Sequence, residues 1–239
     1  MILFYKNAVN VFTDASGMRI NPEKYDGDSY LCCSGFVTTI MGQVINQGFT
    51  VLRSTVNYAE LLAIKMGVTE LLRYRDTDLF LNLFSDSKTN IYALREWYPK
   101  WFQNQVNYNL ITGSGGNKAV ANQELMLFTM KEILDGGCHM NLFHIPGHIR
   151  SNKLKDLGRF KNVFMESNGA RLSYVVPPEE FMRDMAEWNN YIDEKVGRAL
   201  RGPGTFNKVK NTTTRSYHRF PVIWFPKPEE IARYSELIS

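Results

Sequence analysis

Four acidic residues occupy positions where folds of alternating strands and helices carry their functional groups: Asp14, Glu60, Asp86 and Asp156. Asp14 and Asp86 end predicted strands, whereas Glu60 and Asp156 lie on predicted helices. In open α/β sheets, the ends of strands and the starts of helices build the site. Four carboxylates gathered there repel one another unless cations neutralise them, and hard oxygen ligands suit magnesium or manganese. Two such ions about 4 Å apart can activate water and stabilise the leaving oxygen in phosphodiester cleavage.

Each acid also has an ordinary structural explanation. Asp14 and Asp86 could be turn or helix-capping residues, which are often aspartate. Glu60 could close a capping box with Asn57. Asp156 could be a solvated charge on a helix surface. The four together, in this order along the chain, favour a shared site over four separate explanations.

The elements that must position these acids alternate along the chain. Runs rich in β-branched and aromatic residues predict strands at residues 8–13, 31–40, 43–52, 79–84 and 139–144. Apolar residues at helical spacing predict helices at about residues 57–71, 85–101, 119–134 and 152–160. The order of three strands, helix, strand, helices, strand and helix predicts an α/β fold, with a mixed five-stranded sheet flanked by helices.

The chain changes character between about residues 162 and 177, which divides it into residues 1–162 and an extension of residues 163–239. A proline pair followed by two glutamates predicts a helix at about residues 178–201. Its apolar stripe should cover the sheet, or else a protein partner or a second copy of the chain. A basic and aromatic tail follows. Its candidate phosphate contacts are Lys208, Lys210, Arg215 and Arg219. A merely solvated tail is the alternative.

Composition excludes several classes of protein. The 239 residues are 44% hydrophobic and 22% charged, which is ordinary for a globular chain. Neither a membrane span nor a secretory signal is recognisable. Three cysteines without a Cys-x-x-Cys pair argue against a disulfide framework and favour a reducing compartment such as a cytoplasm. The net charge of +4 is weak evidence for a polyanionic partner. Motifs of nucleoside triphosphatases and serine hydrolases are absent.

Four short motifs, taken in order, resemble type 1 (bacterial-type) ribonuclease H. They are residues 11–16 (VFTDAS), 57–61 (NYAEL), 84–88 (FSDSK), and Gly147-His148 followed by residues 152–156 (NKLKD). Trp97 and Trp101 follow the third acid at the spacing of bacterial members, although packing is their simpler explanation. Each motif alone is weak, and the resemblance covers about residues 7–160.

The resemblance implies a ribonuclease H-like fold and an endonuclease that cleaves the RNA strand of RNA–DNA hybrids, leaving a 5′-phosphate and a 3′-hydroxyl. It implies two Mg²⁺ ions, with Mn²⁺ as an alternative, held by Asp14, Glu60, Asp86 and Asp156. His148 matches a loop histidine that moves protons or helps the product leave, which suits an imidazole. Asn57 matches a minor-groove contact to the 2′-hydroxyl. Weaker candidates for nucleic-acid contacts are Ser16, Lys88 and Asn152.

Two departures limit the resemblance. The turn after Asp14 is longer than is usual in the family, and no lysine or arginine lies between Trp101 and Lys118, where bacterial members carry a basic handle. Two other functions stay open: the same fold acting on DNA junctions or double-stranded RNA, and a non-catalytic nucleic-acid-binding module. The expected location is the cytoplasm, or the host cytoplasm if a phage encodes the chain.

Overall fold

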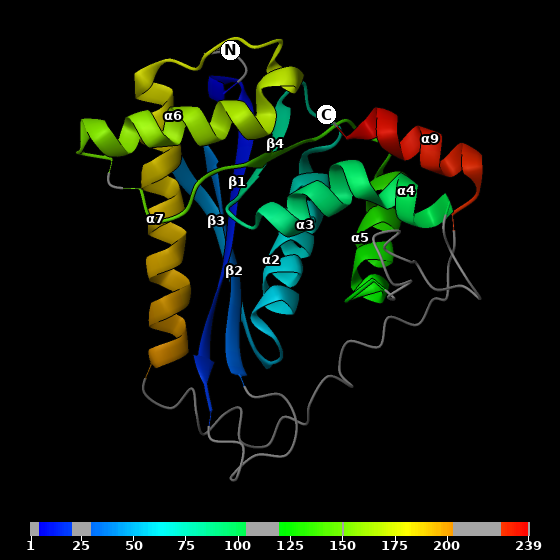
Figure 1. The fold of residues 1–239 in the computed structure, drawn as a ribbon, viewed down its shortest axis with the longest axis horizontal. Helices are drawn as coiled ribbons and strands as arrows, with labels where there is room; N and C mark the ends of the chain where they lie inside the picture. Colours follow the sequence, from blue (N-terminus) through cyan, green and yellow to red (C-terminus); the bar gives the residue numbers. More distant parts are fainter. Residues whose placement is uncertain (1–4, 21–29, 104–119, 150, 203–225, 239) are drawn as a thin grey trace.

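A five-stranded mixed sheet forms the centre of the computed structural model, which describes residues 5–20, 30–103, 120–149, 151–202 and 226–238 (Figure 1). The strands lie in the order β3-β2-β1-β4-β5. β1 pairs antiparallel with β2 and parallel with β4, and β5 continues the parallel half. The strand bounds are β1 (Ala8–Arg19), β2 (Tyr30–Ile40), β3 (Gln43–Arg53), β4 (Phe80–Ser85) and β5 (Asn141–His144).

Helices cover both faces of this sheet. One face carries α2, α3, α4, α5 and α9, and the other carries α6 and α7 (Figure 1). Their bounds are α2 (Val56–Leu71), α3 (Lys88–Tyr92), α4 (Tyr98–Gln103), α5 (Gln123–Gly136), α6 (Leu154–Asn168), α7 (Glu179–Arg201) and α9 (Pro228–Leu237). A π-helical turn, Ala93–Trp97, joins α3 to α4. Within the described ranges, no helix has the length and apolar character needed to cross a membrane.

The sheet separates two apolar cores. Val11 and Leu83 face the core under α2, whereas Phe12 and Phe84 face the core under α6 and α7. This alternation follows the period of two along each strand, and it explains why the central strands are apolar on both sides. Gly67 of α2 lies so close to β1 and β4 that a Cβ there would meet Thr13 and Leu83. Its lack of a side chain therefore lets α2 approach the sheet.

The predicted fold class is confirmed, whereas three local predictions need correction and one helix was missed. β1 does not end before Asp14 but continues to Arg19, because β2 pairs with its whole length. The helix predicted to end at residue 160 runs on to Asn168 as α6. Glu60 does not close a capping box with Asn57, because Thr55 caps α2 by accepting a hydrogen bond from the Tyr58 amide at 3.2 Å. The C-terminal helix α9 was not predicted at all.

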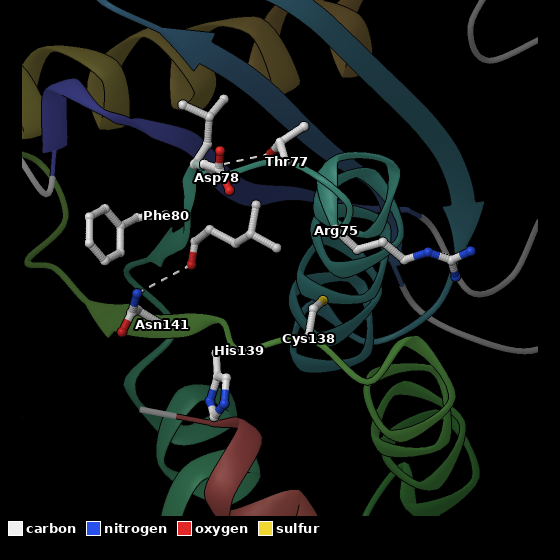
Figure 2. A pocket seen from close by; sticks show the side chains of 9 residues that line it. Arg75, Thr77, Asp78, Phe80, Cys138, His139 and Asn141 are labelled. Carbon is white, nitrogen blue, oxygen red and sulfur yellow. Dashed lines mark hydrogen bonds between the residues drawn. The ribbon is translucent and has the colours of Figure 1, made fainter.

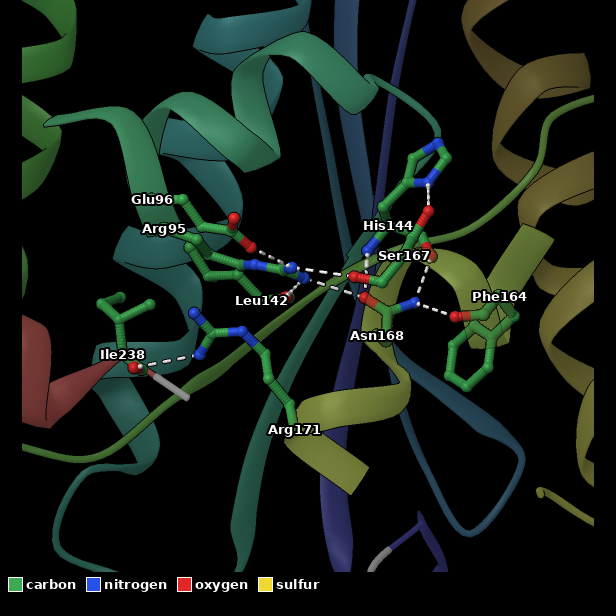
Figure 3. Close-up of polar contacts among 9 residues, drawn as sticks. All are labelled: Arg95, Glu96, Leu142, His144, Phe164, Ser167, Asn168, Arg171 and Ile238. Atoms are coloured by element: carbon green, nitrogen blue, oxygen red, sulfur yellow. Dashed lines mark hydrogen bonds and ion pairs between the residues drawn. The ribbon is translucent and has the colours of Figure 1, made fainter. Parts of the chain in front are cut away.

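A buried polar cluster anchors the end of α6 (Figure 3). The Asn168 side chain accepts from Arg95 at 2.8 Å and donates to the His144 carbonyl at 2.7 Å. His144 Nδ1 lies 2.8 Å from the Ser167 hydroxyl. Burial lowers the pKa of His144 to about 4, with help from the positive charges of Lys88 and Arg95. The ring is therefore neutral near pH 7 and serves as a structural link between β5 and α6.

Candidate active site

Asp14 and Asp86 come together because β1 and β4 run parallel. The last paired residues of the two strands are Thr13 and Ser85, and each aspartate is the next residue along its strand. Asp14 is buried, while Asp86 begins the turn into α3. Asp14 thus lies within β1 at the point where its pairing with β4 ends, and Asp86 directly follows β4, so the two acids are brought side by side.

Glu60 reaches the same edge from the first turns of α2. Its carboxylate accepts a hydrogen bond from Ser87, the residue after Asp86. Asn90 ties the two elements further, since its amide donates to Ser87 Oγ at 2.9 Å and to Asn57 Oδ1 at 3.2 Å. The start of α2 is thus joined to the turn that carries Asp86.

The electrostatics of this edge disfavour negative charge. Burial, followed by the charges of Asp86, Asp193 and Glu60, raises the pKa of Asp14 to about 9. Burial also raises the pKa of Asp86, with a further contribution from Asp193 and an opposing one from His148. The pKa of Glu60 is raised by burial and by Asp86, against the hydrogen bond from Ser87. Such mutually repelling carboxylates are an environment that a bound cation would relieve.

The loop after β5 closes over these acids. The Ile145 amide donates to the Ser85 carbonyl at 3.0 Å, which holds the loop against the end of β4. Any side chain at Gly147 would collide with the Asp86 carboxylate, so glycine is needed for this approach. His148 follows in the left-handed region, with φ of 54°, and its side chain is 83% exposed. The loop therefore presents an imidazole to solvent directly beside the acids.

A model of the RNase H family matches residues 6–157, a segment that holds Asp14, Glu60, Asp86, His148 and Asp156. The chain belongs to the RNase H family. No curated protein matches it. The match ends at the start of α6, so α7 and α9 lie outside the segment that the RNase H family model describes.

Among solved structures, 57 chains are similar to this RNase H family member. One is a foamy viral protease-reverse transcriptase in complex with RNA/DNA hybrid, at 15% identity and a TM-score of 0.49; the match covers 69% of this chain but 20% of that one. The PFV RNase H domain in solution has 16% identity, coverage of 66% and 92%, and a TM-score of 0.48. LC9-RNase H1, a type 1 RNase H with the type 2 active-site motif, has 13% identity, coverage of 77% and 84%, and a TM-score of 0.44.

Asp193 is an acid of this site that the sequence reasoning missed. It lies on α7, with Oδ2 3.5 Å from His148 Nδ1, and it acts electrostatically on both Asp14 and Asp86. Asn189, one turn earlier, is 2% exposed and donates a hydrogen bond to the Asp86 carboxylate. An asparagine four residues before an aspartate is the same spacing as Asn152 and Asp156, so the signal was present in the sequence.

Asp156 occupies a different setting. It lies in the first turn of α6, half-buried, and is not among the main charges acting on Asp14 or Asp86. Asn152 precedes the helix and is exposed. Across the described part of the chain, no three histidine, cysteine or acidic side chains already form a metal-ligating arrangement. The acids therefore share one edge of the sheet without a formed coordination shell.

The remaining predicted contacts surround the acids or lie outside the described residues. Ser16 is half-buried on β1, Asn57 is exposed on α2, and Lys88 is exposed at the start of α3, 3.7 Å from Glu166. Trp97 and Trp101 contact each other, with ring centroids 5.7 Å apart, and pack on the core. The predicted tail contacts lie outside the described residues: Lys208, Lys210, Arg215 and Arg219.

A pocket of about 400 Å³ opens elsewhere, at the start of β4 and β5 (Figure 2). Arg75, Asp78, Phe80 and His139 are among its lining residues. It lies at the opposite ends of these strands from Asp86 and His148. This pocket is thus separate from the acids.

Proposed function

We propose that this chain is a metal-dependent endonuclease that hydrolyses the RNA strand of RNA–DNA hybrids, as a type 1 ribonuclease H does. The observation that carries the proposal is the meeting of Asp14, Glu60 and Asp86 beside the His148 loop, within the segment that matches the family. Asp156 is the fourth acid predicted from the sequence.

The donor set fits two Mg²⁺ ions, or Mn²⁺. Asp14, Glu60 and Asp86 supply only oxygen ligands, which hard divalent cations prefer. Their raised pKa values mark charges that the protein alone does not neutralise. When bound, such ions activate a water molecule and stabilise the leaving oxygen of a phosphodiester.

The chain's own side chains orient the substrate and move protons. His148 is solvent-exposed beside the acids, so its imidazole can exchange protons between the reacting phosphate and bulk water. Asn57 is held by Asn90 at the exposed start of α2, where its amide can meet a 2′-hydroxyl. Nearby phosphate or sugar contacts would come from Ser16, Lys88 and Asn152.

The extension remains part of the proposal. We propose a catalytic region of residues 1–162 and an extension of residues 163–239. The division describes a change in the sequence and not two separate structural units, because residue 162 lies inside α6. α7 covers the sheet through a buried stripe that includes Phe181, Met185 and Ile192. A protein partner or self-association through the extension, and a cytoplasmic location, are further proposals.

The decisive experiment is cleavage of an RNA–DNA hybrid labelled on the RNA strand, with Mg²⁺, with Mn²⁺ and with a chelator. DNA duplex, RNA duplex and single-stranded RNA serve as controls. Cutting of hybrid RNA alone, dependent on metal, is the expected result. Cutting of another duplex would instead assign a different substrate to the same fold. Absence of cutting with both metals would favour a binding module.

The basic tail gives a separate test of hybrid binding. Replacing Lys208, Lys210, Arg215 and Arg219 together by alanine retains α9, whose Tyr234 packs in the core. If all four contact phosphates, the slope of log affinity against log salt should fall by about 3, since each contact contributes roughly 0.7–0.9. An unchanged slope in a filter-binding titration would remove the tail from the interface.

A further inference from the structure

We propose that Asp193, on α7 beyond the matched segment, is the fourth carboxylate of the active site, in place of Asp156. The inference rests on the proposed function, because it assigns a ligand to the same metal-binding edge. It also makes α7 a part of the active site, whereas the sequence places that helix in the extension of residues 163–239.

The first support is the way α7 lies on the sheet. α7 packs against β1 and β2 with a stripe that includes Ile192 and Val196. Gly35 of β2 pairs directly with Asp14 of β1, and a Cβ at Gly35 would meet the Val196 side chain at 2.7 Å. Asp193 precedes Val196 by three residues and so lies on the same helix face. The close approach at Gly35 therefore brings Asp193 toward Asp14.

The second support is a buried amide one turn earlier. Asn189 is 2% exposed, and its side chain donates to Asp86. Its Oδ1 is buried without a hydrogen-bond partner in the protein. A buried oxygen without a hydrogen-bond partner destabilises the fold, and a water molecule or a ligand bound to it removes that cost. α7 thus turns two polar groups, four residues apart, toward the acids from within an otherwise apolar face.

The third support is the hold that α7 has on the histidine loop. Asn190 donates to the Ile149 carbonyl at 2.6 Å, and Arg183 donates to the Ser151 carbonyl at 2.7 Å. Together with the contact between Asp193 and His148, these bonds fix the loop along α7. Asp156 lies instead in the first turn of α6, and it is not among the main charges acting on Asp14 or Asp86.

The test compares Asp193→Asn with Asp156→Asn, each of which removes one charge and keeps the shape of the side chain. Binding of Mn²⁺ is measured by titration calorimetry without substrate, and hybrid cleavage is measured separately. Asp193→Asn should weaken metal binding about 10–100-fold and lower cleavage by about 100-fold or more. Asp156→Asn should change each by less than about threefold. Glu194→Gln, next to Asp193 but exposed and paired with Arg198, is the matched control.

Circular dichroism and thermal melting establish that each variant is folded, and Asp193→Ser provides a second variant if the first is not. The reverse pattern, with metal binding lost in Asp156→Asn and kept in Asp193→Asn, would overturn the inference. Because the metal titration needs no nucleic acid, a wild-type chain that binds Mn²⁺ but cuts no hybrid would refute the proposed function alone. Normal metal binding by both Asp193 variants would refute the inference alone.

Discussion

Helices α6 and α7 cover the same face of the sheet, and each carries an aspartate that follows an asparagine by four residues. At α6 the pair is Asn152, exposed just before the helix, and Asp156, half-buried in its first turn. In α7 the pair is Asn189 and Asp193, in the middle of the helix and against the strands. Identical spacing therefore leads to different surroundings, and packing decides which pair meets the acids of β1 and β4.

The two helices also differ in how they are held. α6 is fixed at its C-terminal end, where Asn168 and Arg95 form the buried cluster with His144. α7 is fixed along much of its length by an apolar stripe over β1 and β2, and by polar bonds to the histidine loop. The comparison assigns α6 mainly to stability and α7 to both stability and chemistry.

The largest effect should come from Asp86, which belongs to the site whether Asp156 or Asp193 is the fourth carboxylate. Asp86→Asn is expected to lower hybrid cleavage by about 10³-fold or more, equivalent to about 4 kcal/mol of transition-state stabilisation. The fold should persist, because burial already disfavours the charged form of the Asp86 carboxyl, as its raised pKa indicates. Single-turnover cleavage measures the loss, and circular dichroism checks the fold. Retained activity would remove Asp86 from the site on either assignment.

The asparagines give a sharper comparison of the helices. Asn189→Ala removes the amide that donates to Asp86 and should lower cleavage about 10–100-fold, as loss of a residue supporting a metal ligand does. Asn152→Ala, at an exposed position, should change cleavage only a few-fold and mainly through KM. Steady-state kinetics separate the two effects. Equal losses in kcat from both variants would contradict the difference between the helices.

The anchor of α6 should affect stability rather than chemistry. Asn168→Ala removes one buried hydrogen-bond acceptor of Arg95 and the side-chain partners of the His144 amide and carbonyl, and it should destabilise the fold by about 2–4 kcal/mol. For a chain of this size the midpoint of thermal unfolding should fall by about 5–10 °C. Lys161→Ala, at an exposed position on α6, is the control and should shift it little. A fall in kcat at a temperature where the variant is folded would argue against a purely structural role.

The smallest expected effect is a dependence of stability on pH through His144. Its pKa in the folded chain is lowered to about 4, so the folded state disfavours the protonated ring. The stability that depends on the neutral ring is fully present above the unfolded pKa near 6.5 and is lost as the pH falls toward 4. About 1–2 kcal/mol should be lost between pH 7 and pH 5. His144→Gln should remove this part of the dependence in urea unfolding. If the free energy of unfolding changed with pH in the same way in the wild type and in the variant, the buried neutral ring at His144 would be contradicted.

Much of the architecture could be predicted from local patterns. Strands of β-branched and aromatic residues and helical apolar spacing predicted all five strands and the cores of α2, α5, α6 and α7. Boundaries were less accurate where tertiary pairing intervenes, as where β2 extends β1 past Asp14. α9 was not predicted, because much of its stability comes from contacts with residues far away in the sequence. Its Tyr234 hydroxyl donates to the Leu94 carbonyl, 140 residues away in the sequence.

The sequence by itself determined the order of the elements, the family, and the placement of Asp14 and Asp86 directly after paired positions of β1 and β4. Parallel pairing of two strands turns equivalent positions in the sequence into neighbours in space. Only the tertiary structure decided which of two identical spacings faces those acids. That choice depends on a close contact between Gly35 and Val196, far apart in the sequence, which sets the position of α7 on the sheet.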